Sequence, residues 1–374
     1  MKIVIIGGHF TPALAVIEGL DKKSNIIYFG RKYTFENDKT ESLEYQTITK
    51  RGIQFVPIIT GRLQRKFTPK TIPSLAKIPY GFFQALSLLR KYKPDSIMGF
   101  GGYLSVPVCL AGRLLGIPVI IHEQTLEAGL ANKFIAQFAA KICISWPSSI
   151  NFFPKQKTVL TGNPLPTSMF NNISNDAKRY DICIIGGSAG SHAINVLIEE
   201  CLPELLEKYT IFHQTGNAQE FQDYDRIVKL KETLPEKLQK RYTIVKYIEP
   251  EQFISVLKEA DLVISRCGIN TITVLLQLQK RSLLIPLPFS QRQEQYKNAL
   301  LLQRTGLGEI IEQQALTSKI LFDKIAFIFN NKKTYEKKVV QIEKTDPLSA
   351  TQKIITIITD ISQKNTKAKI QTDS

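Results

Sequence analysis

The sequence predicts an α/β protein made of two tandem, Rossmann-like, doubly wound domains, each built on a parallel sheet. Short runs rich in Ile and Val alternate with helical stretches along the chain, and continuous apolar runs are typical of strands buried on both faces. This alternation occurs in two successive series, which indicates two domains. The chain has 374 residues, 43% of them hydrophobic, which is enough for two cores.

The first series starts at the amino terminus, where KIVIIGG predicts a strand. A signal peptide is not expected there, because this segment has one Lys and no cleavage-like site. Residues 96–121 are apolar enough to suggest a membrane span, but their Gly and Pro residues and Arg113 predict a loop, a helix and a strand instead. The other strands predicted in this half are at 25–30, 95–102, 118–124 and 141–145.

The second series follows a turn-rich segment at 158–166, which we take as the domain boundary. The predicted domains are therefore 1–160 and 161–345. A last helix is expected at 348–361, where apolar residues recur at helical spacing, and the polar residues 362–374 are expected to fray. The strands predicted in this half begin at residues 180, 209, 242, 260 and 281.

The composition limits the classes of partner. The net charge of +16 favours anionic partners such as nucleotide phosphates or acidic lipids. Binding of nucleic acid is not expected, because no recognised binding motif accompanies the charge. The five cysteines include no CxxC pair and lie mostly in apolar runs, so buried thiols are predicted, and no histidine pair has a metal-binding spacing.

The first candidate site follows the first strand, at Gly7, Gly8 and His9. Glycines allow close approach of a ligand to the backbone, and an imidazole there could accept a proton near neutral pH. His9 could equally serve only to hydrogen-bond its own loop. Further along, GFGGY at 99–103 and IHEQT at 121–125 follow two other strands, and the loops beyond carboxyl ends of parallel strands are where ligands bind.

The second half carries two predicted helix starts that favour anions. Gly186-Gly187-Ser188-Ala189-Gly190-Ser191 opens one helix, and Arg266-Cys267-Gly268-Ile269-Asn270-Thr271 opens another. The first of these could also be an ordinary tight turn between a strand and a helix. Amide side chains cluster at 291–298, and such groups suit sugar hydroxyls, although a solvated helix face would look similar.

Two other features have competing interpretations. Asp223-Tyr224-Asp225 forms a DxD triplet, but its charged surroundings predict a solvated surface instead of a metal-diphosphate site. Residues 61–93 hold eight Lys or Arg and no acid, interleaved with aromatic and aliphatic side chains. This pattern fits an anionic membrane surface, and the alternative is a helix pair that packs inward with its basic side in water.

Taken in order along the chain, the motifs resemble the MurG family, the UDP-N-acetylglucosamine transferases that make lipid II in peptidoglycan synthesis. The resemblance runs nearly end to end. It includes GGHFTPALA, GFGGYLSVP, GIPVIIHEQTLEAGLANK, TGNPLP, GGSAGSHAIN, HQTG, ADLVISRCGINT and LIPLPFSQRQEQYKNA. It implies the glycosyltransferase-B architecture, with two domains facing a central cleft and a last helix that returns to the first domain.

The resemblance also implies roles for particular residues. His9 would be the catalytic base, with Glu123 as the alternative base or as the group that orients an imidazole. Arg266, Asn270 and Thr271 would face the donor diphosphate with Ser188, and the backbone of Ile248 would read the uracil. The N-acetylglucosamine hydroxyls would be read by Glu294, Gln295 and Asn298. The acceptor side would comprise Gly7, Gly8, Tyr103, His122 and Thr125.

The sequence departs from the family pattern at several positions. Thr125 replaces an Asn, Ala189 replaces a Gln, and Pro166 stands where an Arg is common. The first glycine loop also lacks an extra Thr-Gly. Val274 replaces the Glu that normally accepts hydrogen bonds from the ribose, a loss worth about 1.5–3 kcal/mol. Either another group binds the ribose, or the donor binds more weakly, or the donor differs.

The expected reaction is inverting transfer of N-acetylglucosamine from UDP-N-acetylglucosamine to the 4-hydroxyl of an undecaprenyl-diphosphate-linked N-acetylmuramyl-pentapeptide. No metal or other cofactor is expected. The partners would be the UDP-sugar, the lipid-linked acceptor and an anionic membrane surface bound through residues 61–93, at the cytoplasmic face of the plasma membrane. The alternatives are a related glycolipid glycosyltransferase, a UDP-sugar epimerase, or a catalytically weak homologue that scaffolds a cell-wall complex.

Overall fold

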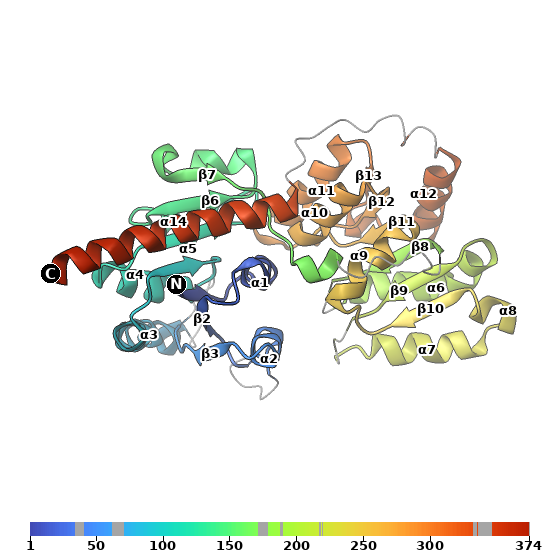
Figure 1. The fold of residues 1–374 in the computed structure, drawn as a ribbon. Helices are drawn as coiled ribbons and strands as arrows, with labels where there is room; N and C mark the ends of the chain where they lie inside the picture. The colour runs from blue at the N-terminus through green and yellow to red at the C-terminus, as the bar shows by residue number, and fades with distance from the viewer. Residues whose placement is uncertain are drawn as a thin grey trace. The chain divides into compact units, whose positions relative to one another are not determined.

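The computed structural model describes residues 1–33, 41–61, 71–170, 179–187, 190–216, 218, 220–331, 335 and 346–373. The chain divides into two compact units. Unit 1 comprises Met1–Thr167 together with Thr345–Ser374, and unit 2 comprises Ser168–Lys344. Each unit contains one sheet, and every strand pair in both sheets is parallel (Figure 1).

Unit 1 is built on a seven-stranded sheet covered by helices. In spatial order the strands are β3 (Gln54–Pro57), β2 (Asn25–Gly30), β1 (Lys2–Ile6), β4 (Ser96–Gly99), β5 (Val119–Glu123), β6 (Lys141–Ile144) and β7 (Thr158–Leu160). The helices are α1 (Phe10–Gly19), α2 (Leu43–Lys50), α3 (Thr71–Tyr92), α4 (Ser105–Leu114), α5 (Leu130–Ile135) and α14 (Pro347–Asp373). Short 3-10 helices lie at Pro147–Phe152, Lys155–Lys157 and Thr167–Phe170.

The buried run of β1 shows why this segment becomes a central strand. Successive side chains of a strand point to opposite faces of the sheet. Ile3 and Ile5 therefore join a cluster with residues of α1 and α14, whereas Val4 and Ile6 join a second cluster with residues of α3, α4 and α5. All four side chains are fully buried, as a sheet covered on both faces requires.

The last helix belongs to unit 1, where it packs against α1 and β4 (Figure 1). It is helical to Asp373, so the expected fraying from residue 362 is wrong. The physical reason is a set of polar anchors beyond Ile361. The buried hydroxyls of Ser362 and Ser96 lie 2.7 Å apart, and the Asn365 amide donates to the backbone oxygen of Asp95 at 2.9 Å.

Unit 2 is built on a six-stranded sheet with the same winding. In spatial order its strands are β10 (Tyr242–Val245), β9 (Ile211–Gln214), β8 (Tyr180–Ile185), β11 (Ala260–Ser265), β12 (Ser282–Leu284) and β13 (Gly308–Ile310). Its helices are α6 (His192–Lys208), α7 (Asp223–Thr233), α8 (Glu236–Gln239), α9 (Pro250–Lys258), α10 (Ile269–Leu278), α11 (Glu294–Arg304) and α12 (Ser318–Asn330). Two 3-10 helices lie at Gln291–Gln293 and Gln313–Ala315.

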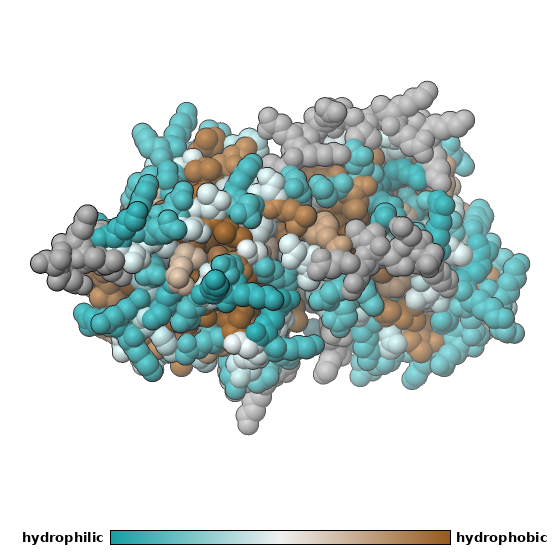
Figure 2. Space-filling model, in the orientation of Figure 1, coloured by the Kyte–Doolittle hydropathy of each residue, from teal (hydrophilic) through white to brown (hydrophobic). Residues whose placement is uncertain are grey.

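The predicted strands are all present, and the prediction of two doubly wound parallel sheets is confirmed. Within 96–121 the structure has β4, α4 and β5, as predicted, and no helix in the described part of the chain is long and apolar enough to cross a membrane. The five cysteines are buried and free, which confirms that prediction as well. Hydrophilic side chains dominate the visible surface (Figure 2).

Candidate active site

In unit 1, the first candidate site is built where the loops after β1 and β4 meet. These strands are neighbours in the sheet, so their carboxyl ends lie at one edge. The backbone N–H of His9 donates to the carbonyl of Phe100 at 3.1 Å. A Cβ on Gly8 would collide with the Gly101 carbonyl, so the contact between the two loops requires glycine. A Cβ on Gly101 would in turn lie 3.4 Å from the His9 ring.

The carboxylate of Glu123 is buried at the end of β5 and accepts four hydrogen bonds. Its Oε1 accepts from the backbone N–H and the hydroxyl of Thr125, at 3.1 and 2.7 Å. Its Oε2 accepts from the N–H of Gly129 and from the Asn132 amide, at 2.9 and 3.0 Å. Four donors therefore occupy the two oxygens of the Glu123 carboxylate.

His9 lies near Glu123 and is half-buried. Burial lowers the pKa of His9 below its ordinary value, and the charge of Glu123 partly offsets that effect. The Asn132 amide lies beside the same loop, because a Cβ on Gly101 would lie 3.4 Å from it. Asn132 also donates to the His122 carbonyl at 3.1 Å. Sequence reasoning did not select Asn132, although it falls within the quoted AGLANK segment.

The other residues predicted for the acceptor side differ in exposure. His122 and Thr125 are buried, so the structure places them beneath the loop instead of on its surface. The Nε2 atom of His122 lies 3.2 Å from the Gly162 carbonyl and 3.1 Å from the Ser145 hydroxyl, and burial lowers the pKa of His122 to about 4. The half-buried ring of Tyr103 lies under the Arg31 guanidinium, 5.7 Å from centroid to Cζ.

The second candidate site lies at the carboxyl ends of β8 and β11 in unit 2. The loop after β8 leads into α6, and the Gln214 amide holds it by donating to the Gly187 carbonyl at 3.0 Å. Gly190 has a φ of +83°, and a Cβ there would collide with the Thr215 carbonyl. The predicted Ser188 lies outside the described residues.

Arg266 joins this loop to the neighbouring strands. Its Nε donates to the Ser191 hydroxyl at 2.9 Å, and Nη2 donates to the Gln313 side chain at 2.6 Å. Its Nη1 donates to the Ile285 carbonyl at 3.1 Å. Burial lowers the pKa of Arg266. None of its hydrogen-bond partners in the described part of the chain is a carboxylate, so a half-buried cation stands beside two helix N-termini.

The predicted sugar-reading amides have structural partners of their own. The Gln295 side-chain oxygen accepts from the N–H groups of Cys267 and Leu287, at 3.2 and 3.0 Å. The buried Asn298 amide donates to the Cys267 carbonyl at 3.0 Å. These contacts connect the turn before α10 to the loop after β12. Asn270 and Thr271 lie in the first turn of α10. Glu294 is the first residue of α11 and is half-buried.

Three further side chains in this unit are buried. Ile248 and Val274 are 4% and 1% exposed. Ser265, at the end of β11, is fully buried, and its hydroxyl has no hydrogen-bond partner within the described ranges; the same holds for Oδ1 of Asn298. Two such atoms at one turn indicate a place where a ligand or water supplies the missing hydrogen bonds.

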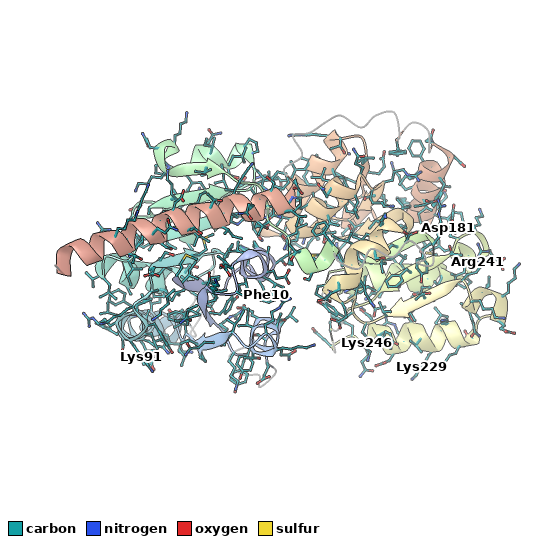
Figure 3. The ribbon with its side chains drawn as sticks, in the orientation of Figure 1. Phe10, Lys91, Asp181, Lys229, Arg241 and Lys246 are labelled. Atoms are coloured by element: carbon teal, nitrogen blue, oxygen red, sulfur yellow. The ribbon has the colours of Figure 1, made fainter. Side chains whose placement is uncertain are left out.

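The prediction that Asp223 lies on a solvated surface is wrong. Asp223 is 5% exposed, and its carboxylate contacts His192 Nδ1 at 2.8 Å, the Asn195 amide at 2.7 Å and the Arg226 guanidinium at 2.8 Å. Burial raises the pKa of Asp223, but the hydrogen bonds from these three residues outweigh it, so the pKa is lowered. The charged sequence around Asp223 did not indicate this hydrogen-bond network, because the residues that form it come from two helices, α6 and α7. Asp225, by contrast, is exposed and lies 3.7 Å from Lys246, near the end of β10 (Figure 3).

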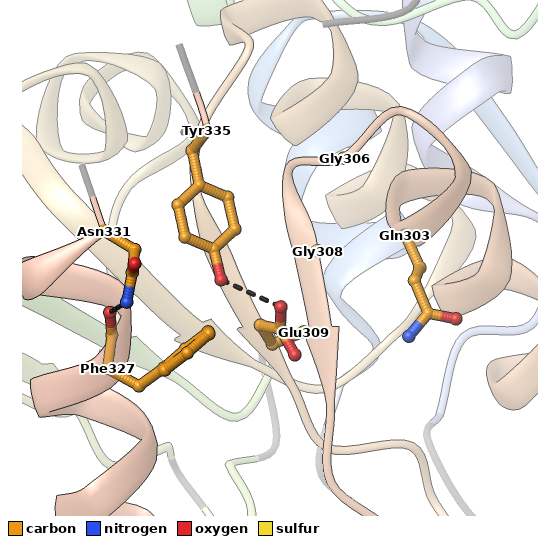
Figure 4. A pocket seen from close by; sticks show the side chains of 7 residues that line it. All are labelled: Gln303, Gly306, Gly308, Glu309, Phe327, Asn331 and Tyr335. Atoms are coloured by element: carbon orange, nitrogen blue, oxygen red, sulfur yellow. Dashed lines mark hydrogen bonds between the residues drawn. The ribbon is translucent and has the colours of Figure 1, made fainter. Parts of the chain in front are cut away.

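A separate pocket of about 200 Å³ lies at the amino end of β13 (Figure 4). Among the described residues that line it, Glu309 carries the one carboxylate, which accepts a hydrogen bond from Tyr335 at 2.8 Å. None of the candidate site residues lines it. The residues that line this pocket are Gln303, Gly306, Gly308, Glu309, Phe327, Asn331 and Tyr335.

Among the described residues, no group of three or more His, Cys, Asp or Glu could hold a metal ion.

Comparison with known proteins places both units in one family. Residues 6–144 match the glycosyltransferase family 28 N-terminal domain, and residues 181–354 match the C-terminal domain of that family. A protein of Clostridium kluyveri is 35% identical over 374 residues, covering 96% of this chain and 98% of its own. That relative is named UDP-N-acetylglucosamine–N-acetylmuramyl-(pentapeptide) pyrophosphoryl-undecaprenol N-acetylglucosamine transferase.

Solved structures agree with this match. MurG of Acinetobacter baumannii has a TM-score of 0.68 at 27% identity, covering 96% of this chain and 99% of its own. UDP-GlcNAc 2-epimerase of Neisseria meningitidis, solved with UDP-GlcNAc bound, has a TM-score of 0.63 at 14% identity, covering 96% and 100%; it shares the fold alone.

The two parallel-sheet units and the matched domains define a glycosyltransferase of the two-domain B type. Within that class, the chain belongs to the MurG family, so the family, fold and enzyme class predicted from the sequence are confirmed.

Proposed function

We propose that this enzyme transfers N-acetylglucosamine from UDP-N-acetylglucosamine to the 4-hydroxyl of the N-acetylmuramyl-pentapeptide carried on undecaprenyl diphosphate. The reaction converts lipid I into lipid II in peptidoglycan synthesis and inverts the anomeric configuration. The relatives that share about a third of their residues over most of the chain are named for this transfer. The likeness to an epimerase concerns the fold alone, so it does not favour the epimerase alternative.

The single observation that supports the donor site best is Arg266. Its guanidinium is half-buried and is hydrogen-bonded only to neutral groups among the described residues. The N-termini of α6 and α10 add positive partial charge at the same edge of the sheet. A diphosphate would balance this charge. Because Arg266 is already held by four neighbours, we infer that it acts mainly through its charge and by fixing Ser191.

In unit 1, we propose His9 as the base. The acceptor hydroxyl attacks the anomeric carbon, the bond from that carbon to the diphosphate oxygen breaks, and His9 takes the hydroxyl proton. The four donors on Glu123 support this assignment over Glu123 itself. In this proposal Glu123 is a positioning residue, which fixes the loop around Asn132 and stabilises the imidazolium by its charge.

Position 274 bears on donor choice. The buried Val274 offers no hydrogen-bond acceptor for a ribose, so we expect the donor to bind with roughly ten- to hundredfold lower affinity than with a charged acceptor there.

The proposed function is tested by measuring transfer from UDP-N-acetylglucosamine and from other UDP-sugars to a lipid I analogue. Preferred transfer of N-acetylglucosamine is expected. Preference for another sugar would favour a related glycolipid glycosyltransferase, and absence of any transfer would favour the scaffold alternative.

We also propose that α3 binds the cytoplasmic surface of the plasma membrane. Tyr80 and Phe83 are 56% and 65% exposed, and the basic residues Arg90 and Lys91 lie in the last turn of the helix (Figure 3). Exposed aromatic side chains next to cations suit an anionic bilayer. The predicted contributions of Arg62, Arg65, Lys66 and Lys70 lie outside the described residues.

A further inference from the structure

His192 has the geometry of an oriented imidazole at the start of α6. Its Nδ1 lies 2.8 Å from the buried carboxylate of Asp223. Its ring stacks on Phe221, with centroids 3.9 Å apart and planes 11° apart. These two contacts fix both the position and the plane of the ring. Its Nε2 makes no hydrogen bond to any residue that the structure describes, and the side chain is 39% exposed.

The charges around His192 leave one negative charge unbalanced. The charged groups joined to it are Asp223 and, through Asp223, Arg226 and Glu199. Two carboxylates against one guanidinium give this group of three side chains a net charge of minus one. His213 is joined through Asn195, but burial lowers the pKa of His213 to about 3, so it stays neutral near physiological pH.

His192 also stands next to the anion-binding end of the helix. It is the first residue of α6, after Ser191, and side chains of a helix tilt toward its N-terminus. The Ser191 hydroxyl accepts from Arg266, which has no carboxylate partner among the described residues. Ser265, whose buried hydroxyl has no partner among the described residues, pairs in register with Ile185, directly before the glycine loop. These are independent indications that an anionic ligand belongs at this edge.

We propose that His192 binds the diphosphate of the sugar donor as an imidazolium, together with the N-terminal N–H groups of α6. Asp223 holds Nδ1, so Nε2–H is the donor that faces the phosphate oxygens. The inference rests on the proposed function, because it adds a ligand to the proposed donor site. Loss of this donor should therefore weaken binding of the diphosphate and leave binding of the uridine unchanged.

The test is calorimetric binding of UDP-N-acetylglucosamine to the full chain. The wild type is expected to bind about tenfold more tightly than H192Q, which keeps a polar side chain but carries no positive charge. H192R keeps a cationic donor at this position and should bind at the level of the wild type.

Two controls separate the possible causes. Uridine has no phosphate, so its affinity should be the same for the wild type and H192Q. Asp223→Asn should weaken binding of UDP-N-acetylglucosamine but not of uridine, because it removes the carboxylate that holds Nδ1 of the His192 ring. H192Q with wild-type affinity for UDP-N-acetylglucosamine, or an equal loss of affinity for uridine, would overturn the inference. No donor binding by the wild type would instead overturn the proposed function.

Discussion

At the scale of single residues, His9 carries the proposed chemistry. His9→Ala is expected to lower kcat by about 10²- to 10⁴-fold, because it removes the proton acceptor, while donor affinity stays unchanged. Burial places the pKa of His9 below its ordinary value of 6.5, and a base must be unprotonated. The acid limb of kcat/KM should therefore lie below pH 6.5. Full turnover by His9→Ala with a lipid I analogue would exclude this role.

Two other histidines predict how stability depends on pH. Burial lowers the pKa of His122 to about 4 and that of His213 to about 3, below the ordinary histidine value of 6.5. The unfolded chain therefore binds protons more readily than the folded one, and stability falls as pH drops below about 6.5. Each histidine lowers the free energy of unfolding by about 1 kcal/mol for each pH unit between about 6.5 and its folded pKa. Urea unfolding should show a shallower pH dependence for His213→Gln, and an unchanged slope would contradict this.

At the scale of elements, the glycine loop before α6 offers a matched pair of variants. An alanine at Gly190 would meet the Thr215 carbonyl and keep a φ of +83°, whereas an alanine at Gly187, with a φ of +88°, would meet nothing within 4 Å. Both variants incur about 1–2 kcal/mol of backbone strain. Only Gly190→Ala should also displace the loop and weaken donor binding by more than tenfold, as measured by calorimetry. Equal losses for the two variants would show that the contact with Thr215 is unimportant.

The strands and helices also differ in how well the sequence predicted them. Long Ile- and Val-rich strands such as β1, β8 and β11 were predictable, because burial on both faces leaves a continuous apolar run. Strands β3, β7 and β13 were not predicted, since they have three or four residues and are only partly buried. The end of α14 was also missed, because polar anchors such as Ser362 look like solvated residues in a sequence.

The candidate site was likewise predictable from the sequence only in part. The loops that carry His9 and Arg266 were predictable, because they follow buried strands. The partners of these residues were not, since they depend on contacts between distant segments. The sequence therefore could not reveal that Glu123 is enclosed by four donors or that Asp223 joins His192.

At the scale of the whole molecule, the net charge of +16 predicts salt-sensitive binding to membranes. The protein is expected to sediment with vesicles that contain anionic lipid, and binding should weaken several-fold as salt rises from about 0.05 to 0.5 M. Phe83→Ser should weaken binding further, because it removes an exposed aromatic side chain from α3. Phe327→Ser on α12, where the ring is 49% exposed, is the matched control. Binding to neutral vesicles at the same level would argue against an electrostatic contribution.

The position of Arg266 has a practical consequence for finding inhibitors. In the part of the chain that the structure describes, only neutral groups hold this half-buried guanidinium, so the free enzyme is less stable than it would be with a counter-ion bound. Compounds with two adjacent negative groups should therefore raise the melting temperature even when they resemble neither sugar nor uracil. A thermal-shift screen of small dianions, starting with inorganic pyrophosphate, would identify such starting scaffolds without synthesis of a lipid substrate.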